Sequence, residues 1–319
     1  MTELNASLAS NFIRIPPFID SHIHFAVDGI PARNEEIVKA AGSMIGSGIL
    51  SVMDCGHKSG IGLEAKTLLF ENNSLLKVNT AGRAIYKKGG YGVFLGIGVS
   101  DRSEAEEAVR GIANSGADFL KIVNSGIVHF KDNAYVTPGG FDSEMLRIIC
   151  EEANEYGLMV KCHANSDSAI RVALASGVSS IEHGFFISKE TLHMMAEKKA
   201  SWTPTIFAMA ALSEGSSPQI KKLIDEVVEN HLIALNYAAS IGVPLAVGTD
   251  SGSKGVRHGA AFFEELRFFS KAGISLEKIL TAACMGEHEI EKGNYLLADK
   301  DFINTGKLQS VFCNGIHLT

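Results

Sequence analysis

Two histidines separated by one residue, His22 and His24, are the first side chains of the sequence that could bind a metal ion. They lie at the end of a run that we expect to form a β-strand, in which residues i and i+2 point to the same face. Neutral imidazoles are good ligands for divalent transition metals. The pair could equally be two polar residues at a strand end, so by itself it leaves both interpretations open.

Three further residues suited to a metal site stand at the ends of later predicted strands. His163 closes the run Leu158–His163, and His183 closes the run Ser179–His183. Asp250 follows another such run, and an aspartate there can bind a metal and accept a proton from metal-bound water. Alternatively, Asp250 caps the segment after it, because an Asp-x-Gly sequence is also typical of turns.

A lysine in an otherwise apolar run adds a less common kind of ligand. Lys121 lies between Leu120 and Ile122, in a strand that we expect to be buried on both faces. Burying an unpaired ammonium group is costly, which favours the neutral amine. A neutral amine can form a Schiff base or take up carbon dioxide to give an anionic carbamate that bridges two metals. The alternative is a lysine that extends to solvent at the strand end.

The elements that position these residues follow a repeated β/α pattern. Short β-branched runs alternate with longer segments of helical periodicity, and glycines such as Gly116 and Gly157 stand where helix C-caps favour them. Eight such units predict an α/β fold of the (β/α)8 TIM-barrel type, with its active site at the carboxyl ends of the strands.

An open doubly wound sheet is the alternative, but no Gly-rich dinucleotide fingerprint follows the first strand. The predicted strands are Pro17–His22, Ile49–Asp54, Leu75–Ala81, Asp118–Val123, Leu158–His163, Ser179–His183, Ala200–Thr205 and Val243–Gly248.

The two ends of the chain do not fit the β/α pattern. Residues 17–289 are assigned to the barrel, whereas the tail contains short apolar runs and an Asn314–Gly315 pair that predicts a hairpin. Such a segment is too short to fold alone. We therefore expect residues 1–16 and 290–319 to form a small, reduced β-sandwich-like appendage on the barrel.

Composition excludes several classes of function. The chain has 319 residues, 46% of them hydrophobic, and a net charge of −7, which argues against disorder and against nucleic-acid binding. Its five cysteines are an odd number without close spacing, which favours a reducing compartment. Neither a secretory signal nor a membrane-spanning run is evident. The sequence predicts a cytoplasmic protein that acts on a small molecule and could form a homo-oligomer.

Taken together, these motifs resemble the amidohydrolase superfamily, and within it the imidazolonepropionase-like branch that includes Xaa-Pro dipeptidases. The resemblance runs from Phe18 to about Leu318. The matching motifs are Phe18–His24, Gly116–Ile122, His163–Ala164, Gly177–Gly184, Pro204–Thr205, Gly248–Ser251 and His258–Gly259.

The resemblance implies a binuclear metal centre and an amide-hydrolysing activity. One divalent ion would be held by His22, His24 and Asp250, the other by His163 and His183, with carboxylated Lys121 and a hydroxide bridging them. Zinc is the metal that the resemblance favours. The hydroxide would attack a peptide, cyclic amide or related small molecule, and Asp250 would pass the proton to the leaving amine.

The sequence departs from the family pattern at two positions that bear on the substrate. Mononuclear deaminases of the superfamily carry a glutamate three residues beyond the strand-five histidine, where this chain has Ser166, so a deaminase is disfavoured. Relatives often have Gly-Gly-His after strand three, where this chain has Tyr91 in place of the histidine. Esters, lactones or phosphotriesters are alternative substrates of the same centre, and a non-enzymatic binding scaffold is a different class. The residues predicted to contact substrate are His57, Arg83, Tyr91, His129 and Arg257.

Overall fold

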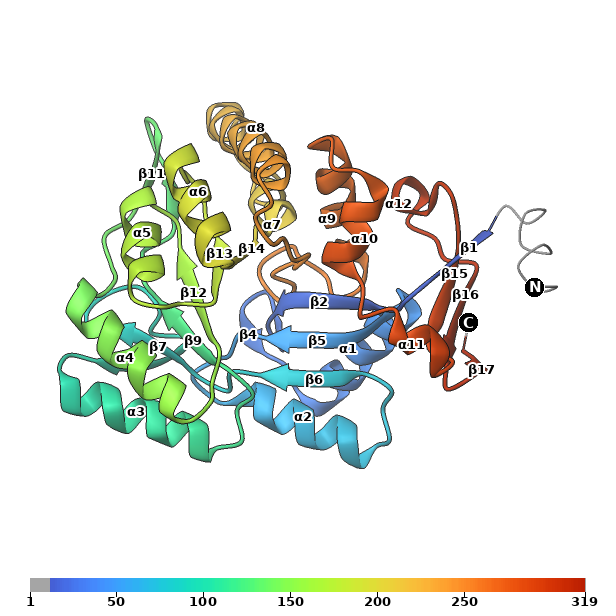
Figure 1. The fold of residues 1–319 in the computed structure, drawn as a ribbon, viewed down its shortest axis with the longest axis horizontal. Coiled ribbons are helices and arrows are strands. Elements are labelled where there is room, and N and C mark those ends of the chain that lie inside the picture. The colour runs from blue at the N-terminus through green and yellow to red at the C-terminus, as the bar shows by residue number, and fades with distance from the viewer. Residues whose placement is uncertain (1–11, 319) are drawn as a thin grey trace.

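The computed structural model describes residues 12–318 and shows an α/β fold built on parallel strands (Figure 1). The strands form a three-stranded parallel sheet in the order β2-β5-β6 and a six-stranded parallel sheet in the order β14-β13-β12-β9-β7-β8. Their bounds are β2 (Phe18–Ile23), β5 (Ile49–Asp54), β6 (Lys77–Thr80), β7 (Ala84–Lys87), β8 (Gly96–Val99), β9 (Leu120–Val123), β12 (Val160–Ala164), β13 (Ser180–His183) and β14 (Ser201–Thr203).

Helices follow most of the strands and pack around the outside of the two sheets (Figure 1). Several begin at a side chain that caps them: Asp101 accepts a hydrogen bond from the Glu104 amide and Asp142 from the Met145 amide. The helices are α1 (Asn34–Gly46), α2 (Ile61–Glu71), α3 (Arg102–Asn114), α4 (Ser143–Glu155), α5 (Asp167–Ala175), α6 (Lys189–Lys198), α7 (Ile206–Ala211), α8 (Pro218–Ser240), α9 (Ala260–Lys271), α10 (Leu276–Ala283), α11 (His288–Glu291) and α12 (Phe302–Thr305).

The third predicted strand, Leu75–Ala81, is shorter than expected and continues after a break as β7. Gly82 has a φ of 61° at the break, a conformation that favours glycine. At this point Asp118 joins the two sheets, since its amide donates to the Thr80 carbonyl and its carboxylate accepts from the Thr80 amide, both at 2.8 Å. A side chain therefore replaces part of the backbone ladder between β6 and β9.

The prediction of a regular eighth strand over Val243–Gly248 was wrong. The segment forms only an isolated bridge to β14. The Trp202 amide donates to the Pro244 carbonyl at 2.8 Å and the Ala246 amide donates to the Trp202 carbonyl at 2.9 Å, but Pro244 has no N–H with which to extend this pairing. On the other side of the segment, the Ser21 amide of β2 donates to the Val247 carbonyl at 2.9 Å. The segment thus lies between β14 and β2, and within residues 12–318 the strands do not pair into one closed sheet.

A separate four-stranded antiparallel sheet joins the two ends of the described chain in the order β1-β15-β16-β17. The predicted hairpin forms at its edge, with the turn residues Asn314 and Gly315 at φ 51° and 76°. Residues 1–11 of the predicted appendage lie outside the described residues, and the boundaries between barrel and appendage stay a prediction. The strands are β1 (Phe12–Ile15), β15 (Tyr295–Asp299), β16 (Ser310–Cys313) and β17 (Ile316–His317).

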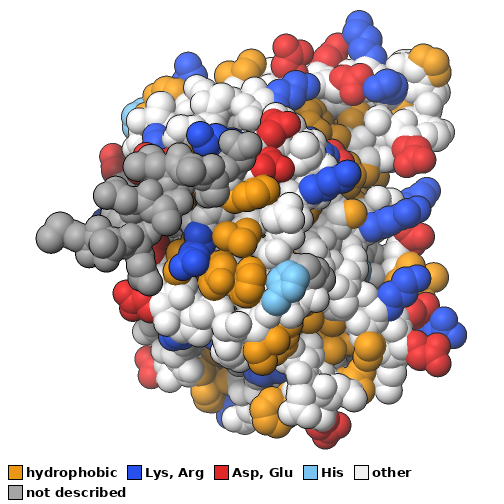
Figure 2. Space-filling view, turned by 90° about the vertical axis from the view of Figure 1, so that its right-hand side faces the viewer, with side chains coloured by type: hydrophobic (Ala, Val, Ile, Leu, Met, Phe, Trp, Pro, Cys, Tyr) orange, Lys and Arg blue, Asp and Glu red, His pale blue; other side chains and the backbone are white. Residues whose placement is uncertain are grey.

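This antiparallel sheet lies nearer to the amino-terminal ends of β2, β5 and β6 than to their carboxyl ends (Figure 1). The arrowheads of β2, β5 and β6 point away from it in Figure 1. Figure 2 shows the face that carries it, where hydrophobic side chains lie in small groups among charged ones. Two short hairpins that the sequence did not indicate, β3–β4 (Ala26–Val27 and Ile30–Pro31) and β10–β11 (Val128–Phe130 and Ala134–Val136), follow β2 and β9.

No helix within residues 12–318 combines the length and the apolar character needed to cross a bilayer.

Candidate metal centre

Six side chains that the sequence singled out line one cavity of about 250 Å³ at the carboxyl ends of the parallel strands. Five of them come from a strand or from the residue directly after it, and Asp250 follows the bridged segment 243–248, as expected where the carboxyl ends of parallel segments meet at one edge. The six are His22, His24, Lys121, His163, His183 and Asp250.

The imidazole rings lie close enough to share metal ions. The ring centroids of His22 and His183 are 4.9 Å apart, and those of His163 and His183 are 4.7 Å apart. Asp250 Oδ1 lies 3.3 Å from His24 Nε2 and 3.6 Å from His22 Nε2. The ligand atoms of His22, His24 and Asp250 all lie within 4.8 Å of one another, so these three residues could hold one ion.

Hydrogen bonds fix which nitrogen of the first two histidines carries the proton. His24 Nδ1 lies 2.9 Å from the Gly56 carbonyl, and His22 Nδ1 lies 2.6 Å from a carboxylate oxygen of Glu182. Both partners only accept hydrogen bonds, so each Nδ1 must donate its proton. In the neutral rings Nε2 then has a free lone pair, and in both residues it is the nitrogen nearest to Asp250.

The other two histidines are oriented in the same manner by neighbouring polar groups. His163 Nε2 donates to the Gly126 carbonyl at 3.1 Å, which leaves Nδ1 with the lone pair. His183 Nδ1 lies 2.8 Å from the Thr205 hydroxyl. Partners of this kind orient metal-binding histidines in general, so the hydrogen bonds fit a site built for metal.

Lys121 is buried at the centre of this group, with 1% of its surface exposed. Its Nζ has no hydrogen-bond partner among the described residues, although the side chain lines the cavity. A buried amine without a partner is costly and rare in proteins. The unpartnered amine therefore indicates that its partner is a group bound in the cavity or attached covalently to the amine.

Burial sets the protonation of the site. It lowers the pKa of His22 and His183 well below the usual value and that of His163 to about 4, so these rings are neutral near pH 7. Burial alone would raise the pKa of Asp250, but the hydrogen bond to His24 and nearby positive charges outweigh it and lower that pKa. The cavity therefore offers neutral imidazoles at His22, His163 and His183 and an ionised carboxylate at Asp250. At His24 burial is outweighed by the hydrogen bond to Asp250, which raises the pKa of that ring.

Several residues of the site are held in backbone conformations that non-glycine residues seldom adopt. The φ angles are 66° at His183, 48° at Thr205 and 57° at Asp250. The Asp250 amide donates to the His22 carbonyl at 2.7 Å, and the indole N–H of Trp202 donates to the His183 carbonyl at 2.9 Å. Strain of this kind persists where surrounding contacts impose it, and it is frequent at functional sites.

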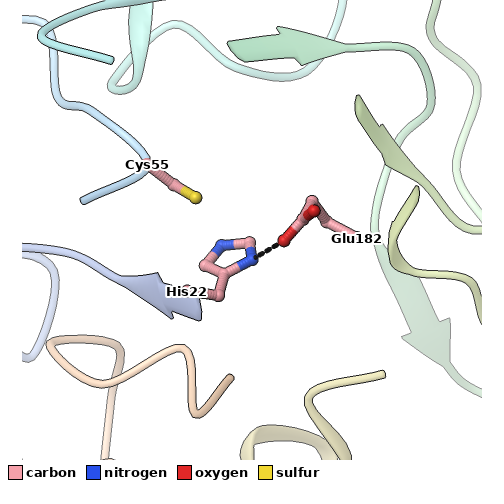
Figure 3. Close-up of side chains that lie close together, drawn as sticks. All are labelled: His22, Cys55 and Glu182. Atoms are coloured by element: carbon pink, nitrogen blue, oxygen red, sulfur yellow. Dashed lines mark hydrogen bonds and ion pairs between the residues drawn. The ribbon is translucent and has the colours of Figure 1, made fainter. Parts of the chain in front are cut away.

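Glu182 is a site residue that sequence reasoning missed. It is fully buried and lies one residue before His183, so regular strand alternation would place the two on opposite faces. The positive φ of His183 ends that alternation, and both residues contact His22. In Figure 3 the Glu182 carboxylate points at the His22 ring, with the Cys55 thiol on the far side of the ring. Burial raises the pKa of Cys55 to about 12, so the thiol is neutral there.

We expect Glu182→Gln to weaken metal binding about 10- to 100-fold, the usual effect of losing an outer partner of a ligating histidine. The amide replaces the charged acceptor of the His22 N–H and removes the ion pair with Lys161. Competition with a chromophoric chelator measures the change. Glu197→Gln, an exposed position on α6, is the matched control and should bind metal like the unmodified protein. Equal affinity in both variants would show that Glu182 has no part in the site.

The residues predicted to contact substrate divide into two groups. His57 and Tyr91 line the cavity, and the Tyr91 ring lies 5.5 Å from that of His163. Arg83 instead lines a separate hollow. His129 and Arg257 do not line the cavity: His129 packs against Tyr135 within the β10–β11 hairpin, and Arg257 is exposed.

Most of the remaining cavity wall is apolar and comes from loops, short hairpin strands and helix α7, which the pattern of the barrel strands could not place. The sequence offered no signal for these residues, because they follow strands at irregular distances. They are Ala26, Phe94, Leu95, Ile127, Val128, Phe185, Ala208, Met209 and Leu212.

Four histidines, an aspartate and an unpaired lysine, gathered around one apolar cavity where parallel segments end, define a class of α/β enzymes with a candidate metal site. The chain belongs to the amidohydrolase family, whose model matches residues 13–288. It is therefore a hydrolase that acts on carbon–nitrogen bonds.

Individual relatives are distant in sequence but similar in fold. An uncharacterized protein of Mycobacterium tuberculosis is 25% identical over 278 residues, which cover 85% of this chain and 72% of the relative. Ochratoxinase of Aspergillus niger is 30% identical over 159 residues, 48% of this chain and 32% of that protein. The crystal structure of a Xaa-Pro dipeptidase with bound methionine has a TM-score of 0.79 at 22% identity, covering 97% of this chain and 87% of that one. The ochratoxinase structure has a TM-score of 0.78 at 19% identity, covering 95% and 82%.

Proposed function

We propose that this protein is a metal-dependent amidohydrolase that cleaves an amide-type bond of a small molecule at a binuclear centre. One observation carries the proposal: free imidazole lone pairs, an ionised carboxylate and an unpaired buried amine meet in a single cavity. Neutral nitrogen ligands together with a carboxylate are a donor set that suits zinc.

The residues divide between two ions as the sequence motifs imply. His22, His24 and Asp250 would hold one ion, and their ligand atoms are already grouped. His163 and His183 would hold the second. Lys121 would bridge them as a carbamate, formed when its neutral amine adds to the carbon of carbon dioxide and releases one proton. The carbamate supplies a negative charge and two oxygens where the structure has an unpaired nitrogen.

Bound divalent ions would polarise the scissile carbonyl and acidify water. The Asp250 carboxylate would accept the water proton and deliver it to the leaving nitrogen, since its low pKa keeps it ionised. Tyr91 would present a phenolic O–H to the substrate, because burial raises its pKa and keeps it protonated. The apolar walls would exclude bulk water from the reacting groups.

We further propose that the two parallel sheets and the segment 243–248 together form a (β/α)8 barrel. The Asp118 link joins β6 to β9, and the segment's hydrogen bonds join β14 to β2. With β6 and β7 counted as one interrupted strand and the edge strand β8 left out, eight parallel segments follow this order, which supports a barrel in which two junctions are irregular. Free thiols at all five cysteines support a reducing compartment such as the cytoplasm.

The alternative reactions receive less support from the site. Ser166, which stands where deaminases carry an acid, accepts the Ala169 amide as the N-cap of α5 and is committed to that helix. Amide hydrolysis depends strongly on protonation of the leaving nitrogen. Ester and lactone hydrolysis depends less on protonation of the leaving oxygen. A carboxylate placed to deliver that proton therefore favours amides. A structurally similar protein is named a Xaa-Pro dipeptidase, and such an enzyme cleaves a peptide bond, which is an amide.

Chelation tests the proposal directly. Treatment with a strong chelator should abolish hydrolysis of an amide panel, and adding back about two zinc ions per chain should restore it, as expected for two-metal hydrolases. Elemental analysis of the purified protein gives the metal content independently of activity. A chelated, metal-free protein that still hydrolyses amides at the full rate would overturn the proposal.

A further inference from the structure

The charges that line the cavity restrict the substrate. Apart from the six proposed metal-centre residues, Lys254 is the one Asp, Glu, Lys or Arg side chain among the described residues of the cavity lining. His57 also lines it, but burial lowers its pKa and leaves it neutral near pH 7. Among residues 12–318, Asp250 is the one carboxylate in the lining, and it is already shared between His22 and His24.

Lys254 stands on a turn whose backbone is fixed by close contacts. Gly252 has a φ of 95°, and a Cβ there would lie 2.2 Å from the His24 carbonyl oxygen. The Gly252 amide donates to the Val256 carbonyl at 3.0 Å, and the Gly255 amide donates to Asp28 Oδ1 at 3.0 Å. Within residues 12–318 the Lys254 ammonium has no ion pair, so its charge is available to a ligand.

An apolar wall connects this lysine to the metal centre. Helix α7 begins after Thr205, which contacts His183, and its residues Ala208 and Met209 line the cavity. The same wall reaches Leu212, about 10 Å from Thr205 along the helix axis at 1.5 Å per residue. A Cβ on Gly255 would lie 3.9 Å from Ala211, so the Lys254 turn adjoins the far end of the wall.

We propose, on the basis of the proposed function, that Lys254 selects substrates that carry a carboxylate and a bulky apolar group but no ammonium group. The apolar group would pack along α7, and the carboxylate would pair with the Lys254 ammonium at the cavity mouth. A free ammonium group finds no unshared carboxylate in the cavity, so its desolvation is left uncompensated. N-acylated amino acids with apolar side chains therefore fit better than dipeptides with a free amino terminus.

Three related compounds test this selection: N-benzoyl-L-leucine, its uncharged C-terminal amide, and L-phenylalanyl-L-leucine, which has a free ammonium group. We expect kcat/KM for N-benzoyl-L-leucine to exceed that for the other two by about two- to fivefold, the worth of one ion pair with an exposed lysine. Lys254→Met should remove the advantage over the amide, mainly through KM. Lys254→Glu should reverse the preference towards the ammonium compound, whereas Lys271→Met, an exposed control on α9, should change neither ratio.

A binding measurement separates this inference from the proposed function. Calorimetric titration of the Asp250→Asn variant with N-benzoyl-L-leucine and with its amide reports the selection without turnover. If the acid binds more tightly than the amide and Lys254→Met removes this difference, the inference is supported. If, in addition, the unmodified protein hydrolyses none of the compounds, that result counts against the proposed function alone. Equal affinity for acid and amide, or preference for the dipeptide in the unmodified protein, would overturn the inference whatever the activity.

Discussion

Lys121→Ala is expected to lose at least one metal ion per chain and to reduce turnover on the order of a thousandfold or more, because Lewis-acid activation contributes several kcal/mol. The residue contributes a buried nitrogen that no group within residues 12–318 satisfies. As a carbamate it would balance the charge of two cations, and alanine leaves them without that ligand. Elemental analysis and turnover on one sample measure both effects, and added short carboxylic acids should restore part of the activity by occupying the vacated space.

A second substitution tests whether Lys121 is merely structural. Lys121→Met keeps the length and apolar stem of the side chain but removes the unpaired amine, so the metal-free variant should be at least as stable as the metal-free parent protein. The carbamate interpretation predicts a stable protein that binds metal poorly. A Lys121→Met variant with full metal content and unreduced turnover would show that the lysine has no role in the centre.

Asp250→Asn is expected to retain the fold and to lower turnover by about a hundredfold to ten-thousandfold, the usual range for a lost general base. Asparagine tolerates the left-handed backbone conformation found at Asp250, where φ is 57°, so the substitution adds no strain. It removes the negative charge that faces His22 and His24. Turnover and melting temperature, measured on the same zinc-saturated sample, separate a chemical role from a structural one.

Asp28→Asn is the matched control for Asp250→Asn. Asp28 also has a positive φ, 49°, and it accepts a hydrogen bond from the Gly255 amide that an asparagine oxygen could accept equally well. It is exposed and does not line the cavity. Turnover close to that of the unmodified protein is expected for this variant. If Asp250→Asn behaved the same way, Asp250 would have no part in proton transfer.

The sequence by itself determined which residues stand at the carboxyl ends of the strands. His22 and His24 follow from the two-residue period of a strand, and His163 and His183 from the ends of apolar runs. Lys121 was found because a charged side chain interrupted a run that should be buried. These are local properties of the chain, and the parallel arrangement brings such ends together without further information. The family pattern then assigned them to one centre.

Only the tertiary structure decided how those residues are oriented and what surrounds them. Glu182 reaches His22 across the fold, and the apolar wall of α7 reaches the cavity through the path of a loop. The pairing of residues 243–248 depends on which neighbour meets Pro244, so the expected regular strand does not form. Contacts between residues far apart in the chain depend on the packing of whole elements, and periodicity reports only the face on which each residue lies.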